Sequence, residues 1–264
     1  MAIVAQAPEP RFVLAGDGTP LATYDEGDAD APVVLAVHGF ASSASVNWWA
    51  TGWVRELTRS GHRVLALDQR GHGLSGKPRD PAAYTMDTLV ADVQAVLDTH
   101  LVAEASFVGY SLGARVGWHV AVTSPQLVSR AVLGGIPDGL PLTRFQVDQA
   151  LAFAREGTPV PDRLTRAYVD MAARIPGNDL EALVALVAGM RDGDQPDPEN
   201  PPRQPVLFAT GTEDGIIAAS RRLAEATPQG SFFPVPGRNH FNAPTSRAFR
   251  GAALPFLAGD SVGG

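Results

Sequence analysis

The sequence predicts an α/β protein whose mostly parallel central sheet is covered by helices on both faces. Short, unbroken apolar runs recur along the chain, and this pattern is typical of strands buried on both sides. They alternate with segments of helical periodicity, which indicates parallel strands joined by right-handed crossovers. The length of 264 residues, with 45% hydrophobic and 19% charged residues, is sufficient for one sizeable core.

The first half of the chain supplies most of the predicted sheet. Residues 11–14 and 21–25 flank an Asp-Gly pair at 17–18, which predicts a hairpin. The helix predicted at 46–60 should stop at Gly61. The alternation then predicts buried strands at 32–37, 63–67, 105–109 and 128–133, and further helices at 87–101 and 112–122.

The alternation breaks after the strand that ends at Leu133. From about Ile136 to Gln204 the sequence contains three helical patterns and no convincing strand, which predicts an inserted helical lid. We therefore expect a core made of 1–135 and 204–264, and a lid at 136–203. Helices are predicted at 143–156, 162–175, 179–190, 216–226 and 243–257, and strands at 206–210 and 231–235.

Charge and composition limit the partners and the chemistry that can be expected of this protein. The net charge is −7 with no block of like charges, which argues against nucleic acid. The absence of cysteine excludes disulfides and thiolate catalysis. The first residues lack a secretory pattern, and no apolar run approaches the roughly 20 residues of a membrane span. We expect a cytoplasmic protein, and a homodimer remains open.

A G-x-S-x-G motif lies directly between a predicted strand and a predicted helix. It runs from Gly109 to Gly113 and places Ser111 at the turn. In this context the glycines let the strand and the helix approach closely, and the turn lifts the serine hydroxyl clear of the sheet. The motif predicts Ser111 as a nucleophile.

With this motif the sequence resembles the α/β-hydrolase fold superfamily, and further segments extend the resemblance over nearly the whole chain. Residues 38–40 (His-Gly-Phe) are similar to its oxyanion loop, and 68–75 to its D-x-R-G-x-G-x-S loop. Residues 211–214 are similar to its acid loop. Residues 237–240 resemble its G-x-G-H segment, although Asn239 replaces the second glycine. The resemblance implies a serine hydrolase with a Ser-His-Asp triad.

A serine needs a base to take its proton, and six histidines compete for this role. The fold's chain order of serine, acid, histidine leaves His119 and His240. His119 lies about 12 Å along the predicted helix at 1.5 Å per residue, too far to reach the serine, so His240 is predicted as the base. His62 and His100 are expected at the surface. Two loop histidines, His38 and His72, are expected to shape the site through hydrogen bonds.

The acid that orients His240 is predicted to be Asp214, which follows the strand at 206–210. Glu213 and Asp138 are alternative candidates for the acid. A further alternative is that Asp214 has no catalytic role and only caps the helix that follows it. Two backbone N–H groups, those of Leu112 and Phe40, are predicted to stabilise the oxyanion.

Other patterns are rejected as ligand sites. Residues 71–76 match G-x-G-x-x-G, but Pro78 and Pro81 follow where a dinucleotide-binding helix should begin. The acidic residues between 192 and 199 lack the spacing of a calcium loop. No cofactor and no metal are therefore expected. Trp48 and Trp49 fit core packing better than an acyl pocket. The apolar lid residues fit either a pocket or core packing: Phe145, Leu151, Phe153, Tyr168, Met171, Leu183 and Leu186.

The leading expected reaction is hydrolysis of a small-molecule carboxylic ester. In the superfamily that the sequence resembles, haloalkane dehalogenases and epoxide hydrolases attack their substrates with an Asp. A serine at position 111 therefore argues against both activities. C–C bond hydrolase, lactonase, thioesterase and cofactor-free perhydrolase or haloperoxidase activities share the same triad and stay open. A ligand receptor on this fold is an alternative from another class.

Overall fold

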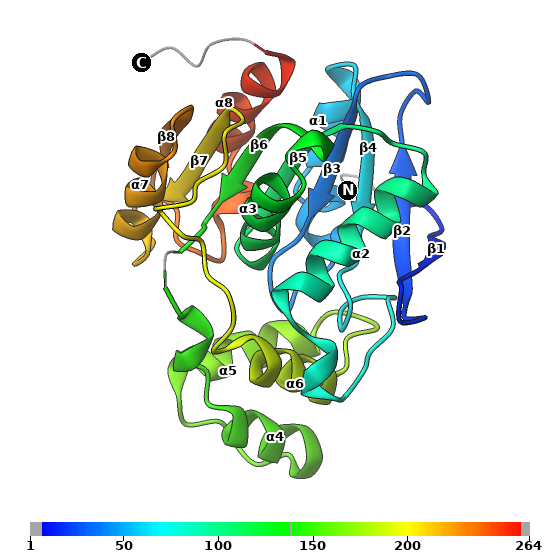
Figure 1. The fold of residues 1–264 in the computed structure, drawn as a ribbon. Helices are drawn as coiled ribbons and strands as arrows, with labels where there is room; N and C mark the ends of the chain where they lie inside the picture. Colours follow the sequence, from blue (N-terminus) through cyan, green and yellow to red (C-terminus); the bar gives the residue numbers. More distant parts are fainter. Residues whose placement is uncertain (1–6, 138, 260–264) are drawn as a thin grey trace, which may run out of the picture.

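A central sheet of eight strands organises the protein, for which we have a computed structural model that describes residues 7–137 and 139–259 (Figure 1). Its spatial order is β1-β2-β4-β3-β5-β6-β7-β8. β2 runs antiparallel to both of its neighbours, and all pairs from β4 to β8 are parallel. The predicted fold class is therefore confirmed. The strands are β1 (Arg11–Leu14), β2 (Pro20–Glu26), β3 (Val33–Val37), β4 (Arg63–Leu67), β5 (Ala105–Tyr110), β6 (Val128–Gly134), β7 (Val206–Gly211) and β8 (Gly230–Val235).

Helices cover both faces of this sheet, with α2, α3 and α7 on one face and α1 and α8 on the other (Figure 1). Each face carries its own apolar core, which explains why the central strands are apolar on both sides. The helices are η1 (Ser45–Trp49), α1 (Trp53–Arg59), η2 (Pro81–Ala83), α2 (Met86–Thr99), α3 (Leu112–Thr123), η3 (Pro125–Leu127), η4 (Pro141–Arg144), α4 (Val147–Glu156), α5 (Arg163–Ala173), α6 (Leu180–Met190), α7 (Ile217–Ala226), η5 (Ala243–Thr245) and α8 (Arg247–Ala258).

The single helix predicted at 46–60 is wrong. The segment forms a π-helical turn, η1, followed by the separate helix α1. Gly52 stands between them with φ +85°, a left-handed conformation that interrupts a right-handed helix. Trp48 and Trp49 on the first piece are buried in the core, as expected.

Two other predicted helices begin later than expected. The helix predicted from residue 143 is preceded by the short turn η4, and α4 begins at Val147. The last helix is divided at Ser246, whose hydroxyl accepts a hydrogen bond from Phe249 N–H and so caps α8.

Three helices lie between β6 and β7 in the chain, and α4, α5 and α6 group together at the end of the sheet to which the C-terminus of β6 points (Figure 1). α6 buries most of its surface, including Leu183 and Leu186. The loop between α5 and α6 touches the core, because Asn178 accepts a hydrogen bond from Gly73 N–H (2.8 Å). The lid boundaries at 136 and 203 stay a prediction.

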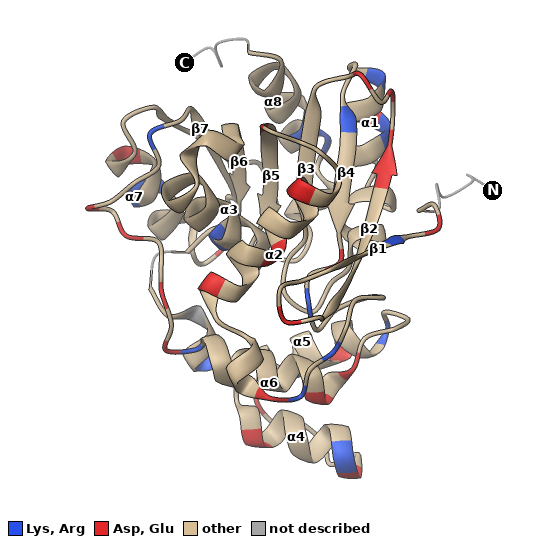
Figure 2. Ribbon diagram, turned by 45° about the vertical axis from the view of Figure 1, so that its right-hand side comes forward, with Lys and Arg blue, Asp and Glu red and all other residues tan. Residues whose placement is uncertain are grey.

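Acidic and basic residues are interspersed over both the sheet region and these three helices (Figure 2). Among the residues that the structure describes, no helix combines the length and apolar character that a membrane crossing requires.

Candidate active site

The single residue Ser111 joins β5 to α3 and holds a strained backbone. Its φ of 53° and ψ of −111° are unusual for a side chain other than glycine and cost on the order of 1–3 kcal/mol. Serine at this position normally caps the helix that follows, but the Ser111 side chain makes no capping hydrogen bond. The hydroxyl is therefore directed to another partner.

The two glycines of the motif make this turn possible. A Cβ at Gly109 would overlap the carbonyl of Gly113, and a Cβ at Gly113 would overlap the carbonyl of Val37. Helix α3 thus packs directly on the backbone of β3 and β5, as the sequence predicts for this motif.

The hydroxyl of Ser111 meets the imidazole of His240. His240 Nε2 lies 2.9 Å from Ser111 Oγ, and His240 Nδ1 lies 2.8 Å from Asp214 Oδ2. Because an ionised carboxylate only accepts hydrogen bonds, Nδ1 carries the proton and Nε2 is left to accept the serine proton. The structure therefore brings together the three residues that the sequence predicts, from three distant parts of the chain.

Asp214 is the carboxylate that reaches His240. Its side chain is buried, and Oδ1 also accepts a hydrogen bond from Ile216 N–H (3.2 Å) at the start of α7. The alternative Glu213 is exposed, and within the described residues its side chain makes no hydrogen bond or ion pair with the imidazole. The other alternative, Asp138, lies outside the described residues.

The turn that carries His240 does not need the glycine that Asn239 replaces. Asn239 keeps a negative φ, and its side chain accepts hydrogen bonds from the backbone N–H groups of Phe241 (3.0 Å) and Asn242 (3.2 Å). The Asn242 side chain accepts one from Asn239 N–H in return (2.9 Å). The buried Tyr110 hydroxyl donates to the carbonyl of His240 and ties the turn to β5.

The expectation that His62 and His100 lie at the surface is wrong. His62 is buried just before β4 and contacts Ser60 Oγ (3.0 Å). The ring of His100 packs against β2, with Nε2 3.1 Å from Thr23 Oγ1. His62 lies between α1 and β4, and His100 caps the C-terminus of α2, so position at an element boundary does not imply exposure. His119 lies on α3, where burial lowers its pKa to about 4.

The two loop histidines shape the site through hydrogen bonds, as expected. In each, Nδ1–H donates to a backbone carbonyl. His38 Nε2 accepts from Gln69 N–H (3.0 Å), and His72 Nε2 accepts from Ala41 N–H (3.0 Å). These partners require neutral rings. Burial lowers the pKa of His38, and burial together with the neighbouring His38 holds the pKa of His72 well below its usual range.

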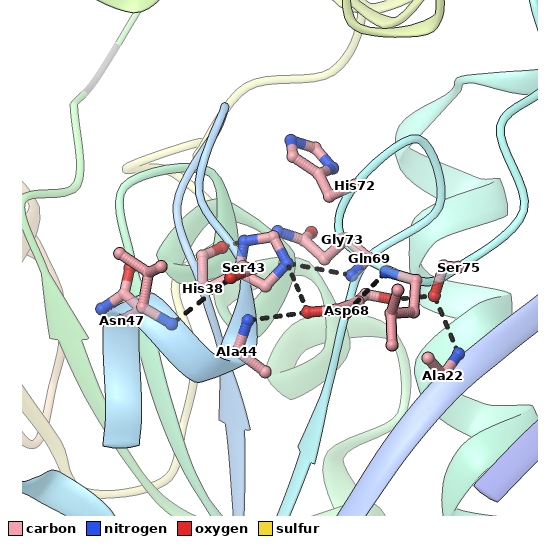
Figure 3. Close-up of polar contacts among 12 residues, drawn as sticks. Ala22, His38, Ser43, Ala44, Asn47, Asp68, Gln69, His72, Gly73 and Ser75 are labelled. Carbon is pink, nitrogen blue, oxygen red and sulfur yellow. Dashed lines mark hydrogen bonds and ion pairs between the residues drawn. The ribbon is translucent and has the colours of Figure 1, made fainter. Parts of the chain in front are cut away.

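Asp68 completes this buried network beneath the loop that follows β3 (Figure 3). Its Oδ1 accepts from Ala44 N–H (2.7 Å), and its Oδ2 accepts from Leu74 N–H and from the Tyr24 hydroxyl (2.9 Å each). The backbone N–H groups of Ala41 and Ala44 donate to this network, which therefore fixes the loop at 39–44 and with it the position of Phe40.

Both predicted oxyanion donors line the cavity beside Ser111. Leu112 follows it at the first position of α3, and Phe40 lies on the loop after β3. Within the described residues neither backbone N–H donates a hydrogen bond to the protein. Two N–H groups are thus available next to the hydroxyl, which is what an oxyanion requires.

Two cavities meet at Ser111. One has a volume of about 530 Å³ and the other of about 310 Å³, and Phe40, Ser111, Tyr168, His240 and Phe241 line both. Some of the apolar residues of the predicted lid line a cavity, and others are packed in the core. Phe145 and Tyr168 line the larger cavity, Tyr168 and Met171 line the smaller one, and Leu183 and Leu186 are buried in the core.

Two residues of the site are not predicted from the sequence. Tyr110 occupies a variable position of the G-x-S-x-G motif, and Arg115 lies on the helix that follows it. A signal for Arg115 exists in the sequence, because it is a charge among apolar residues of a helix that should be buried on most sides.

Proteins of known family resemble this chain in sequence and in structure. Residues 32–159 match the sequence model of the alpha/beta hydrolase fold. The chain is also 30% identical over 249 residues to a non-heme chloroperoxidase of Streptomyces lividans, a match that covers 83% of this chain and 86% of that protein. The chain belongs to the α/β-hydrolase fold family.

Other members of the family match over shorter stretches. Epoxide hydrolase B of Mycobacterium tuberculosis is 37% identical over 113 residues, which is 42% of this chain. The chain spans only 30–41% of the length of the first such relatives, epoxide hydrolases among them. Among solved structures, the enol-lactonase from Burkholderia xenovorans LB400 superimposes with a TM-score of 0.77 at 25% identity, over 94% of this chain and all of that one.

Proposed function

We propose that the protein is a serine hydrolase that cleaves a carboxylic ester through an acyl-enzyme on Ser111. The observation that carries the proposal is the continuous hydrogen-bonded chain from Ser111 through His240 to Asp214, with distances of 2.9 Å and 2.8 Å. Such a chain activates a hydroxyl that is otherwise a weak nucleophile at neutral pH.

In the first half of the reaction, Ser111 Oγ attacks the carbonyl carbon of the ester while His240 Nε2 takes the hydroxyl proton. Asp214 stabilises the imidazolium that results. The backbone N–H groups of Phe40 and Leu112 donate to the oxyanion. When the C–O bond to the alcohol breaks, His240 returns its proton to the leaving oxygen and the acyl group stays on Ser111.

In the second half, water enters where the alcohol left. His240 takes a proton from the water, and the hydroxyl oxygen attacks the acyl carbon. Collapse of the second tetrahedral intermediate releases the carboxylic acid and returns the proton to Ser111. The two cavities on either side of Ser111 offer separate space for the acyl and the alcohol portions.

Lactones are the second substrate class that a specific observation favours. A lactone is a cyclic ester and opens by the same steps, and the likeness to an enol-lactonase extends over the whole length of that protein. Serine at the turn, where the epoxide-opening branch carries aspartate, supports ester chemistry over epoxide opening.

A panel of p-nitrophenyl esters and small lactones tests the proposal. Wild-type protein should turn over members of the panel, and Ser111→Ala should lower kcat by more than about 10⁴-fold, because the acyl-enzyme cannot form. A fluorophosphonate probe should label wild type at Ser111 and leave the variant unlabelled. A wild-type protein with neither turnover nor labelling is not a serine hydrolase.

A further inference from the structure

One buried guanidinium faces the site without a carboxylate partner. Arg115 lies on α3 four residues after Ser111, so the two share one side of the helix, ~6 Å apart along its axis at 1.5 Å per residue. The residue is only 2% exposed and lines the larger cavity together with Ser111 and Leu112.

Within the part of the chain that the structure describes, the hydrogen bonds of Arg115 leave most of its donors unused. Nη2 donates to the backbone carbonyl of Asp194 (3.1 Å), and Nε is buried without an acceptor. No carboxylate of the described residues forms an ion pair with this guanidinium. Its pKa is lowered to about 10 by burial, with no negative charge to compensate, so the group is still charged at neutral pH.

The other buried arginines of this protein are paired. Arg70 is 1% exposed and forms a bidentate ion pair with Asp92, with both distances 2.6 Å. Arg250 lies 3.0 Å from the carboxylate of Glu56. Burial of a charge without a partner is costly, and breaking such a pair typically destabilises a protein by about 3–5 kcal/mol. Arg115 therefore lacks the compensation that this fold supplies elsewhere.

The surroundings of Arg115 favour an anion. Arg144 lines the same cavity, and the acidic residue of that lining, Asp214, is already bonded to His240. This wall is positively charged in a chain whose net charge is −7. The rest of the lining is largely apolar, as for Leu140, Leu142, Phe145, Leu164 and Ile216.

We propose that Arg115 binds a carboxylate of the substrate, so that the preferred substrates are half-esters of short dicarboxylic acids, with the free carboxylate on the acyl portion. The guanidinium would hold that carboxylate by charge-assisted hydrogen bonds, while the ester carbonyl lies at Ser111. The separation along α3 suits an acyl chain of a few carbon atoms. This inference rests on the proposed ester hydrolysis.

Binding without turnover tests the site. In the Ser111→Ala background, calorimetry compares monomethyl glutarate with methyl pentanoate, which has the same acyl chain length and no charge. We expect Arg115→Gln to lower the affinity for monomethyl glutarate by about 10- to 100-fold, because a charge-assisted hydrogen bond is lost. The affinity for methyl pentanoate should not change. Glutamine retains a donor for the Asp194 carbonyl, and Arg115→Lys should keep part of the affinity.

Arg166→Met is the control, because Arg166 is an exposed arginine of α5 that lines neither cavity. It should change the affinity for monomethyl glutarate by less than about threefold, as expected for a screened charge. The carboxylate site is refuted if Arg115→Gln binds monomethyl glutarate as tightly as the Ser111→Ala parent does. It is also refuted if the substitution lowers the affinity for both ligands by the same factor.

Turnover separates the two proposals. The p-nitrophenyl half-ester of glutaric acid and p-nitrophenyl pentanoate are compared in wild type and in Arg115→Gln. A kcat/KM loss confined to the half-ester supports the site, and an equal effect on both esters contradicts it. If neither ester is cleaved but binding of monomethyl glutarate depends on Arg115, the anion site stands and the hydrolase proposal falls.

Discussion

At the scale of single residues, the orientation of one imidazole depends on one carboxylate. Asp214 bonds His240 Nδ1 through Oδ2 and the backbone of α7 through Oδ1, so the carboxylate cannot rotate without losing one of the two. The imidazole is further held by its own backbone, whose carbonyl accepts from Tyr110. These bonds present Nε2 to Ser111 in the state that accepts a proton.

Asp214→Asn should lower kcat by about 10³- to 10⁴-fold on a cleaved p-nitrophenyl ester. The amide fills the same space, but it favours the tautomer that carries the proton on Nε2, which cannot then accept the serine proton. The matched control is Glu213→Gln at the exposed neighbouring position, with kcat expected within twofold. An Asp214→Asn variant that kept more than a tenth of the wild-type kcat would assign the acid role to another residue.

At the scale of elements, the site depends on how closely α3 packs on β3 and β5. The strained turn at Ser111 is maintained because the sheet and the helix on either side of it are both fixed by core packing. Glycine is required where the helix backbone crosses the strand backbone, and Gly113 faces the carbonyl of Val37 at that crossing.

Gly113→Ala should destabilise the protein, because the added methyl overlaps backbone that cannot move without shifting the helix. We expect urea unfolding to show a loss of about 1–3 kcal/mol or more. Gly251→Ala in α8 is the control, since its Cβ meets nothing within 4 Å. It should stabilise by about 0.5–1 kcal/mol through helix propensity. Equal effects at the two positions would contradict the close crossing.

At the scale of the whole molecule, neutral histidines are part of the core. His38 and His72 are fully buried with hydrogen-bond partners that suit only a neutral ring, and burial also lowers the pKa of His62, His100 and His119. An unfolded chain exposes these rings to water, where the ordinary pKa is about 6.5.

Stability should therefore fall as the pH is lowered from 7.5 to 5.5. Below about pH 6.5 the unfolded chain binds more protons than the folded one, and each such histidine contributes a slope of up to about 1.4 kcal/mol per pH unit. Asp17, whose pKa is lowered by its hydrogen bond from Arg70, titrates at more acidic pH. Urea unfolding at successive pH values measures the slope, which His119→Gln should reduce. If stability stayed constant or increased as the pH was lowered over this range, the histidines would not be buried in the neutral form.

Much of the fold and of the site followed from local patterns. The strands are short apolar runs and the helices have apolar periodicity, and both patterns lie within a dozen residues of sequence. The G-x-S-x-G motif could be interpreted because its neighbours predict a strand and a helix. The break at Gly52 was missed because glycine within a helical pattern is ambiguous until its φ is known.

By itself, the sequence determined the fold class, the elbow at Ser111 and a histidine that had to follow it in chain order, since each depends on short-range pattern or on order along the chain. Three features depend on how distant segments pack: the choice of Asp214 over its exposed neighbour Glu213, the burial of the His62 and His100 side chains, and the lack of a carboxylate partner for Arg115 among the described residues. The physical reason is the same in each case. A contact partner, or the lack of one, is set by which distant segments pack together, and adjacent residues with the same charge differ only in the direction that packing gives them.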